Sequence, residues 1–151
     1  MDFPARVTES ISVATEMSEA VGETVLEAYL SNNSRDLLLL LESEQQVINA
    51  IPNFNLLKSL ASHAVTITAK ENSVDFVSRF FAPNMGIPED HVTGSAHTTL
   101  IPFWASRLNK EEMTAKQLSK REGTLYCKNS GDRVKISGKA VLYLQGEIFC
   151  T

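Results

Sequence analysis

Cysteine and basic residues are both scarce in this sequence, and each shortage removes a class of protein from consideration. The two cysteines, Cys127 and Cys150, form no CxxC pair; one disulfide between them stays open, but a disulfide-rich secreted framework is not indicated. Lys and Arg number 14 against 18 Asp and Glu, which gives a net charge of −4. Without a basic face, the chain is not expected to bind nucleic acid.

The sequence also lacks a segment that would cross a membrane or direct secretion. Its longest apolar run, Leu37 to Leu41, is far shorter than the roughly 20 residues of a membrane-spanning helix. The first ten residues include Asp2, Arg6 and Glu9 and contain no apolar signal-peptide core. We therefore expect one cytoplasmic domain of 151 residues, with reduced cysteines and no membrane partner.

Short elements are predicted along the first 90 residues from periodicity and from the placement of proline and glycine. Leu37 to Leu41 is apolar throughout and bounded by charges, which is typical of a strand buried on both faces. The other predicted elements are a weak helix over 9–30, two short helices over 44–62 separated by Pro52, strands over 64–70 and 73–83, and a loop marked by Pro83, Gly86 and Pro88.

Charge is missing from residues 91–106, although the sequence as a whole is 21% charged. Five apolar side chains spaced four apart trace one stripe of a helix there: Val92, Ala96, Leu100, Trp104 and Leu108. Ile101 and Phe103 add apolar groups to other faces, and a helix that is apolar nearly all round is a buried one. Pro102 within it should bend the axis or leave a carbonyl without its helical partner.

Residues 114–149 alternate in polarity and are punctuated by glycines, which predicts four short antiparallel strands. Strands thus precede and follow a single apolar helix, and the strands are the available covering for it. The predicted class is α+β, with a curved, antiparallel-rich, barrel-like sheet wrapped around one buried central helix.

The start of the uncharged stretch is the strongest candidate for a binding site. Ser95 is the expected N-cap of the helix, whose first backbone N–H groups have no partners within the helix and carry partial positive charge. Gly94 would let a ligand approach the backbone closely, which favours a carboxylate or a phosphate. The alternative, that Thr93, Gly94 and Ser95 only cap the helix, stays open on spacing alone.

Neighbouring polar residues offer weaker candidates. Glu89 and Asp90 could act as paired carboxylates in acid–base chemistry, although adjacent loop residues usually point apart into solvent. His91 and His97 do not have the i, i+4 spacing of a helical zinc pair and no HExxH motif is present, so no metal site is expected. Ser95 lacks the second glycine of a G-x-S-x-G nucleophile turn.

Four motifs give these residues a family context: R-F-F-A-P (79–83), E-D-x-V-T-G-S-A-H (89–97), Q-L-S-x-R-x-G-x-L (117–125) and V-x-I-S-G-x-A (134–140). With MDFPAR at residues 1–6, they closely resemble the phenazine-biosynthesis PhzF-like family of the diaminopimelate-epimerase superfamily, over almost the whole chain. The resemblance implies a fold of two similar halves, each a curved sheet around a central helix. It assigns residues 1–151 to the C-terminal half.

The resemblance also implies a chemistry: cofactor-independent isomerisation or epimerisation, in which a proton moves on a small carboxylate substrate without any metal. On the matching motif, Asp90 and Ser95 become the expected catalytic residues. Gly94, Ser95 and Ala96 become the expected substrate-binding residues, at a cleft between the two halves.

Three departures from the family pattern affect this expectation. His91 stands where the family usually has proline, and Glu122 where it often has a second glycine. The family's proton-transfer glutamate belongs to the first half, so neither Glu16 nor Glu19 can be assigned its role. The chain is therefore expected to be incomplete as an enzyme and to pair with a missing N-terminal half or with a second copy as a homodimer. The alternative is a non-catalytic binding or interaction protein that retains the fold.

Overall fold

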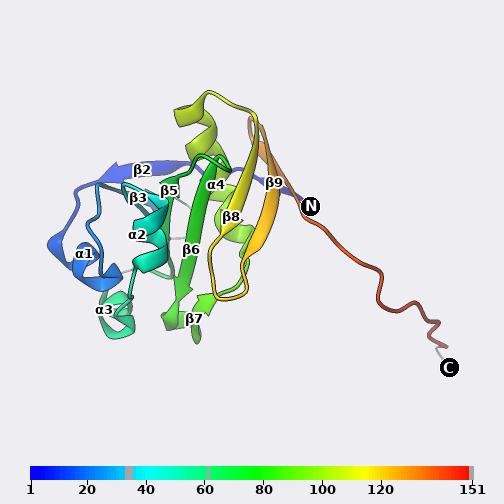
Figure 1. The fold of residues 1–151 in the computed structure, drawn as a ribbon, viewed down its shortest axis with the longest axis horizontal. Helices are drawn as coiled ribbons and strands as arrows, with labels where there is room; N and C mark the ends of the chain where they lie inside the picture. Colours follow the sequence, from blue (N-terminus) through cyan, green and yellow to red (C-terminus); the bar gives the residue numbers. More distant parts are fainter. Residues whose placement is uncertain (33–35, 61, 150–151) are drawn as a thin grey trace.

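The computed structural model describes residues 1–32, 36–60 and 62–149 (Figure 1). The helices are α1 (Thr15–Val21), α2 (Glu44–Asn49), α3 (Phe54–Ser59), the 3-10 turn η1 (Pro83–Met85) and α4 (Gly94–Leu108). The strands are β1 (Asp2–Pro4), β2 (Thr8–Ile11), β3 (Glu27–Ser31), β4 (Leu37–Leu40), β5 (Val65–Lys70), β6 (Phe76–Ala82), β7 (Ile87–Asp90), β8 (Glu112–Gln117), β9 (Gly123–Ser130) and β10 (Arg133–Ser137).

Within the described residues, the strands form one curled sheet in the order β1-β10-β9-β8-β6-β5-β4-β3-β2, with β7 added beside β6. The pairs β4–β5 and β6–β8 are parallel and the others antiparallel, so the predicted α+β class with an antiparallel-rich curved sheet is confirmed. β1 and β2 stand at opposite ends of this order, although only residues 5–7 separate them in the chain. The N-terminal segment therefore joins the two ends of the curled sheet.

β4 shows why the leucine run is buried on both faces. Leu38 and Leu40 belong to a core cluster that contains α4 side chains such as Leu100 and Trp104. Leu37 and Leu39 belong to a second cluster, formed with the small helices α1, α2 and α3. Successive strand residues point to opposite faces, so one strand contributes to two cores. Figure 1 shows α1, α2 and α3 together on one side of the sheet and α4 behind β6 and β8.

α4 is buried from Ala96 to Ile101 and again from Phe103 to Ala105. Pro102 has no N–H to donate to the carbonyl of Thr98 one turn earlier. The backbone amide of Arg6, between β1 and β2, donates to that carbonyl at 2.9 Å. The proline therefore frees a carbonyl, as expected, and the crossing N-terminal segment satisfies it.

Several predicted elements are confirmed, and the helix over 9–30 is wrong for most of its length. α2 and α3 lie on either side of Pro52, and β5 and β6 lie within the two predicted strands. Residues 9–30, however, divide into part of β2, the seven-residue α1 and most of β3. Gly22 ends α1 with φ 76°, and a Cβ there would lie 2.7 Å from the carbonyl oxygen of Ile51, so the helix stops where the chain packs closely.

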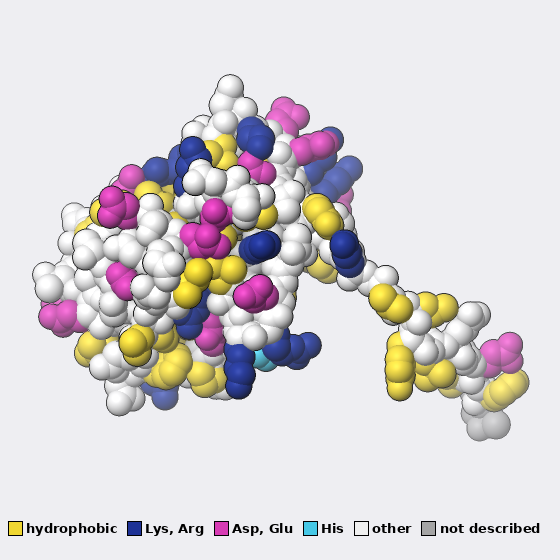
Figure 2. All heavy atoms as spheres, viewed as in Figure 1, with side chains coloured by type: hydrophobic (Ala, Val, Ile, Leu, Met, Phe, Trp, Pro, Cys, Tyr) yellow, Lys and Arg dark blue, Asp and Glu magenta, His cyan; other side chains and the backbone are white. Residues whose placement is uncertain are grey.

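Two further corrections concern strands. The predicted loop at 83–88 contains η1 and then the start of β7, where Pro88 is tolerated because β7 pairs only with β6. The described residues after Lys110 form β8, β9 and β10; the fourth predicted strand is wrong, because residues 138–149 are unpaired and β10 is already flanked by β1 and β9. They form an exposed tail that leaves the body, and Figure 2 shows its apolar side chains projecting from a surface of interspersed charges.

None of the helices among the described residues is long and apolar enough to cross a membrane.

Candidate anion-binding site

α4 begins two residues earlier than expected from the sequence. Thr93 is the N-cap, Gly94 is the first helical residue, and Ser95 is exposed in the first turn, so the assignment of Ser95 as N-cap is wrong. The Thr93 side chain makes no cap bond to the helix, and its hydroxyl donates to Asp90 instead.

The first amides of α4 are consequently left open. In the part of the chain that the structure describes, no acceptor is hydrogen-bonded to the backbone N–H of Gly94, Ser95 or Ala96. Three consecutive open amides at a helix N-terminus carry partial positive charge and favour an anion. The structure thus brings together the three residues that the sequence assigned to substrate binding.

A buried amide holds the loop in front of these groups. Gln117 of β8 is fully buried; its Oε1 accepts from the Thr93 amide at 2.8 Å. Its Nε2 donates to the Asp90 carbonyl at 2.9 Å and to Thr93 Oγ1 at 3.1 Å. Thr93 Oγ1 in turn donates to Asp90 Oδ2 at 2.6 Å. Asp90, half-buried at the end of β7, is therefore placed three residues before the N-cap and oriented toward it.

Glu89 does not share this arrangement. Its carboxylate binds the Arg79 guanidinium in two places, at 2.7 Å and 3.1 Å. Arg79 also donates to the carbonyls of Val47 and Ala50, at 3.2 Å and 2.9 Å, so it ties β6 and β7 to α2. Glu89 and Asp90 thus point to different partners, and the paired-carboxylate hypothesis is wrong in the geometry of this loop.

A hollow of about 440 Å³ lies near the start of α4. Met1, Val92 and Gly123 line it, and Met1 also reaches the helix, since its methyl carbon would lie 3.9 Å from a Cβ built on Gly94. A Cβ at Gly123 would lie 2.3 Å from a methyl group of Val92, so a larger residue there would displace the Val92 side chain. Met1 thus lies between this hollow and Gly94, although no residue of α4 lines the hollow itself.

The two neighbouring histidines have separate environments. His97 is fully buried inside the sheet, where its Nδ1 lies 2.8 Å from the Thr93 carbonyl oxygen and its ring is tilted against Phe76. Burial lowers the pKa of His97 to about 4, against an opposing effect of the hydrogen bond to Thr93. His91 is exposed, and its carbonyl accepts from Ser119. Among the described residues, no group of three His, Cys, Asp or Glu side chains is placed to hold a metal ion.

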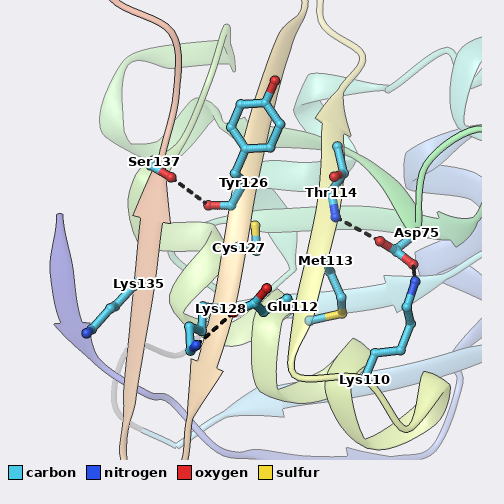
Figure 3. A pocket seen from close by; sticks show the side chains of 10 residues that line it. All are labelled: Asp75, Lys110, Glu112, Met113, Thr114, Tyr126, Cys127, Lys128, Lys135 and Ser137. Carbon is cyan, nitrogen blue, oxygen red and sulfur yellow. Dashed lines mark hydrogen bonds and ion pairs between the residues drawn. The ribbon is translucent and has the colours of Figure 1, made fainter.

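A second hollow, of about 550 Å³, lies over β8, β9 and β10 (Figure 3). Four of its charges are paired: Lys110 with Asp75, and Lys128 with Glu112 at 2.7 Å. Lys135 is exposed and forms no ion pair among the described residues. Cys127 lies beneath this surface, and burial raises the pKa of its thiol to about 12, so it offers no thiolate. No helix N-terminus is among the residues that line this groove. Cys150 lies outside the described residues.

Sequence reasoning found the amides and Asp90 but missed the residues that hold them. Gln117 and Arg79 both stand in motifs quoted above. The pattern of polar and apolar residues, however, does not reveal which loop either side chain contacts. Their one local signal is a polar side chain at a buried kind of position: Arg79 stands in β6, which is otherwise buried, and Gln117 continues the buried face of β8 after Met113 and Ala115. A buried polar side chain implies a hydrogen-bond partner, which only the fold identifies.

Comparison with known proteins gives a consistent result. The sequence model of the PhzC-PhzF family, described as "Phenazine biosynthesis-like protein", matches residues 1–146. The chain is 47% identical over 148 residues to an uncharacterized isomerase of Pseudomonas aeruginosa, covering 98% of this chain and 56% of the relative. It is 35% identical over 166 residues to phenazine biosynthesis-like domain-containing protein 1 of Mus musculus, covering 98% of this chain and 58% of that protein.

The fold is similar to solved structures as well. A crystal structure of a phenazine biosynthesis protein of the PhzF family from Enterococcus faecalis has a TM-score of 0.90 and 43% identity, covering 99% of this chain and 57% of that chain. A crystal structure of a putative PhzC/PhzF phenazine biosynthesis protein from Clostridium difficile has a TM-score of 0.84 and 43% identity, covering 99% of this chain and 57% of that chain. The chain therefore spans a little over half the length of these proteins.

Proposed function

The chain belongs to the PhzC-PhzF, or phenazine biosynthesis-like, family, and from this membership we propose that it forms one wall of a cofactor-independent isomerase site. The substrate class is a small molecule with a carboxylate. The observation that carries the proposal is the set of open amides at Gly94, Ser95 and Ala96, directly after the loop in which Thr93 holds the Asp90 carboxylate.

Each group has a role in this proposal. The three amides bind the substrate carboxylate and favour negative charge that develops next to it when a proton leaves. The exposed Ser95 hydroxyl is available to hydrogen-bond the same group. Asp90 supplies one of the two acid–base groups that a proton shift needs, one to take the proton and one to return it. No electron is transferred, so the reaction requires no redox cofactor.

The second acid–base group is placed in the part of the relatives that this chain does not match. In this proposal the chain is the C-terminal half of a two-half molecule, and the hollow beside α4 faces the other half. A non-catalytic binding protein is the second candidate, and one observation favours it: the amides and the network around Asp90 are formed by this chain alone.

We test the anion site by NMR titration of the Gly94 to His97 amides with acetate. The helix-terminus contribution of roughly 0.3–1 kcal/mol, up to about 2 when partly buried, supports only weak binding, with a Kd of roughly tens to hundreds of millimolar. Gly94→Val should abolish binding by blocking the approach to the backbone. A Cβ at Gly94 meets only the Met1 methyl at ordinary contact distance, so the fold tolerates a side chain there.

Gly146→Val is the matched control, because a Cβ there has nothing within 4 Å and the residue lies in the tail. Asp90→Asn should keep or slightly improve acetate binding, because a negative charge near the amides is removed. If the wild-type amides do not shift, or if Gly94→Val binds acetate like wild type, the loop only caps the helix and the proposed function is wrong.

A further inference from the structure

Among the described residues, the fully buried side chain of Gln117 has all its hydrogen-bond partners within residues 90–93. Burying an amide is costly unless its polar atoms are satisfied. All three recorded bonds of Gln117 go to Asp90 or Thr93, between 2.8 and 3.1 Å. The partners lie 24 and 27 residues away in the sequence, so the contact belongs to the folded state and joins β8 to the site.

The order of donors and acceptors in this network is determined. A backbone N–H can only donate, so the Gln117 atom that faces the Thr93 amide is the carbonyl oxygen, and the other atom is the NH₂ group. That group donates to Thr93 Oγ1, so the hydroxyl proton is left to donate to Asp90 Oδ2. The chain of bonds runs in one direction, from Gln117 through Thr93 to Asp90.

The Thr93 side chain is turned toward this network and not toward the helix. A threonine at an N-cap usually accepts from an amide of the first helical turn. Here Oγ1 accepts from Gln117 and donates to Asp90, and it makes no cap bond to the helix. The network thus holds the Thr93 amide and one carboxylate oxygen of Asp90, Oδ2.

We propose that Gln117 and Thr93 are positioning residues of the site: Gln117 fixes the loop, and Thr93 fixes the rotamer of Asp90. This inference rests on the proposed function, because it concerns the same carboxylate and amides. It assigns separate tasks to the two residues. Gln117 acts on both the amides and Asp90, whereas the Thr93 hydroxyl acts on Asp90 alone.

The test is the χ1 rotamer of Asp90 in the ligand-free protein, measured from three-bond NMR couplings. Wild type and Thr93→Ser, which keeps the hydroxyl, should show one rotamer. Thr93→Val, which has the same shape without the hydroxyl, should show averaged couplings while acetate binding stays near wild type. Gln117→Met should average the couplings, shift the Thr93 amide and weaken acetate binding by about fivefold, the fold-change of one net hydrogen bond.

Thr68→Val serves as the stability control. Thr68 is also fully buried and loses two hydrogen bonds on substitution, to Val77 and from Trp104, neither of which belongs to residues 90–93. It should destabilise the protein and leave the Asp90 couplings unchanged. A single Asp90 rotamer in Thr93→Val, or averaging in Thr68→Val, overturns the inference. Failure of the proposed function is distinguishable, because it appears as wild-type amides that do not respond to acetate, whatever the Asp90 rotamer.

Discussion

His97 has one ring nitrogen whose partner is known and one without a partner among the described atoms. Nδ1 faces the Thr93 carbonyl, which can only accept, so Nδ1 carries the proton and Nε2 carries none. Nε2 is buried, and no hydrogen-bond partner for it lies in the described part of the structure. Because a cation there would be desolvated, burial lowers the pKa to about 4, and the histidine is neutral at pH 7.

We expect the folded state to lose stability between pH 6.5 and pH 4 because of this residue. The ordinary pKa of 6.5 applies to the unfolded chain and about 4 to the folded one, so the unfolded chain binds the proton first as pH falls. The loss is about 3 kcal/mol by pH 4. Denaturant unfolding of wild type and His97→Asn across this range should show their difference in unfolding free energy shrinking toward low pH.

The comparison is controlled by His91→Asn, which removes an exposed histidine instead. Carboxylates whose pKa is lowered in the fold, such as Glu27 and Asp75, also reduce stability in acid, but they are common to all three proteins. A constant difference between wild type and His97→Asn over the whole range would contradict the neutral, buried state of His97.

α4 is hydrogen-bonded to the N-terminal segment at the carbonyl that Pro102 leaves without a helical donor. Pro102 cannot donate to the Thr98 carbonyl, and the Arg6 amide takes that place at 2.9 Å. The helix interior therefore has an acceptor that only a separate segment can satisfy. This contact joins the helix to the segment between the two ends of the sheet, and it explains how a proline is retained in the middle of a buried helix.

Arg6→Pro should destabilise the protein by about 1–3 kcal/mol, because it removes the donor and leaves a buried carbonyl unpaired. Adding Pro102→Ala restores an N–H within the helix and should recover about 1 kcal/mol or more of that loss. The double-mutant cycle is measured by urea unfolding. Arg6→Ala keeps the backbone amide and reports the side-chain contribution; equal effects of Arg6→Pro with and without Pro102→Ala would refute the coupling.

The sequence predicts an element correctly where all residues of that element share one environment, so that their polarity pattern reflects it directly. The β-branched, apolar run in β5 and the apolar face of residues 94–108 each reflect a uniform environment, and both were predictable. Residues 9–30 were not, because β2 and β3 pair across α1, and that pairing depends on where Gly22 packs against Ile51. The N-cap shifted from Ser95 to Thr93 for a similar reason, since a distant glutamine determines how the loop enters the helix.

The whole chain presents an apolar tail that its own body does not cover. Val141, Leu142, Tyr143 and Leu144 are all at least 78% exposed. Residues 138–149 have no helix or strand structure, and no hydrogen bond to the body is found among the described residues. Exposed apolar runs of this kind favour association with a further chain. We propose that the isolated chain, when no other half is present, self-associates through the tail as a homodimer.

Val141→Asp with Tyr143→Asp should convert the self-associated protein into a monomer, because both substitutions place charge in the surface that is buried on association. Analytical ultracentrifugation over a concentration series measures the change, and circular dichroism should stay the same because the body does not depend on the tail. Gln145→Asp, which adds charge at a position that is already polar, should leave association intact. A wild-type chain that stays monomeric throughout the series would exclude the proposal.

The position of β1 has a consequence for the order in which the molecule assembles. Phe3 pairs with Val134 and Asp2 with Lys135, so β1 can pair only once β10, which comes much later in the sequence, is in place. Until then, β3 to β6 can pair with strands that are near in the sequence, while residues 2–4 remain unpaired. Closing so long a loop is entropically costly and slows folding in proteins dominated by distant contacts. Ring closure is therefore expected as the last and slowest phase of refolding, with the Arg6–Thr98 contact formed in the same step.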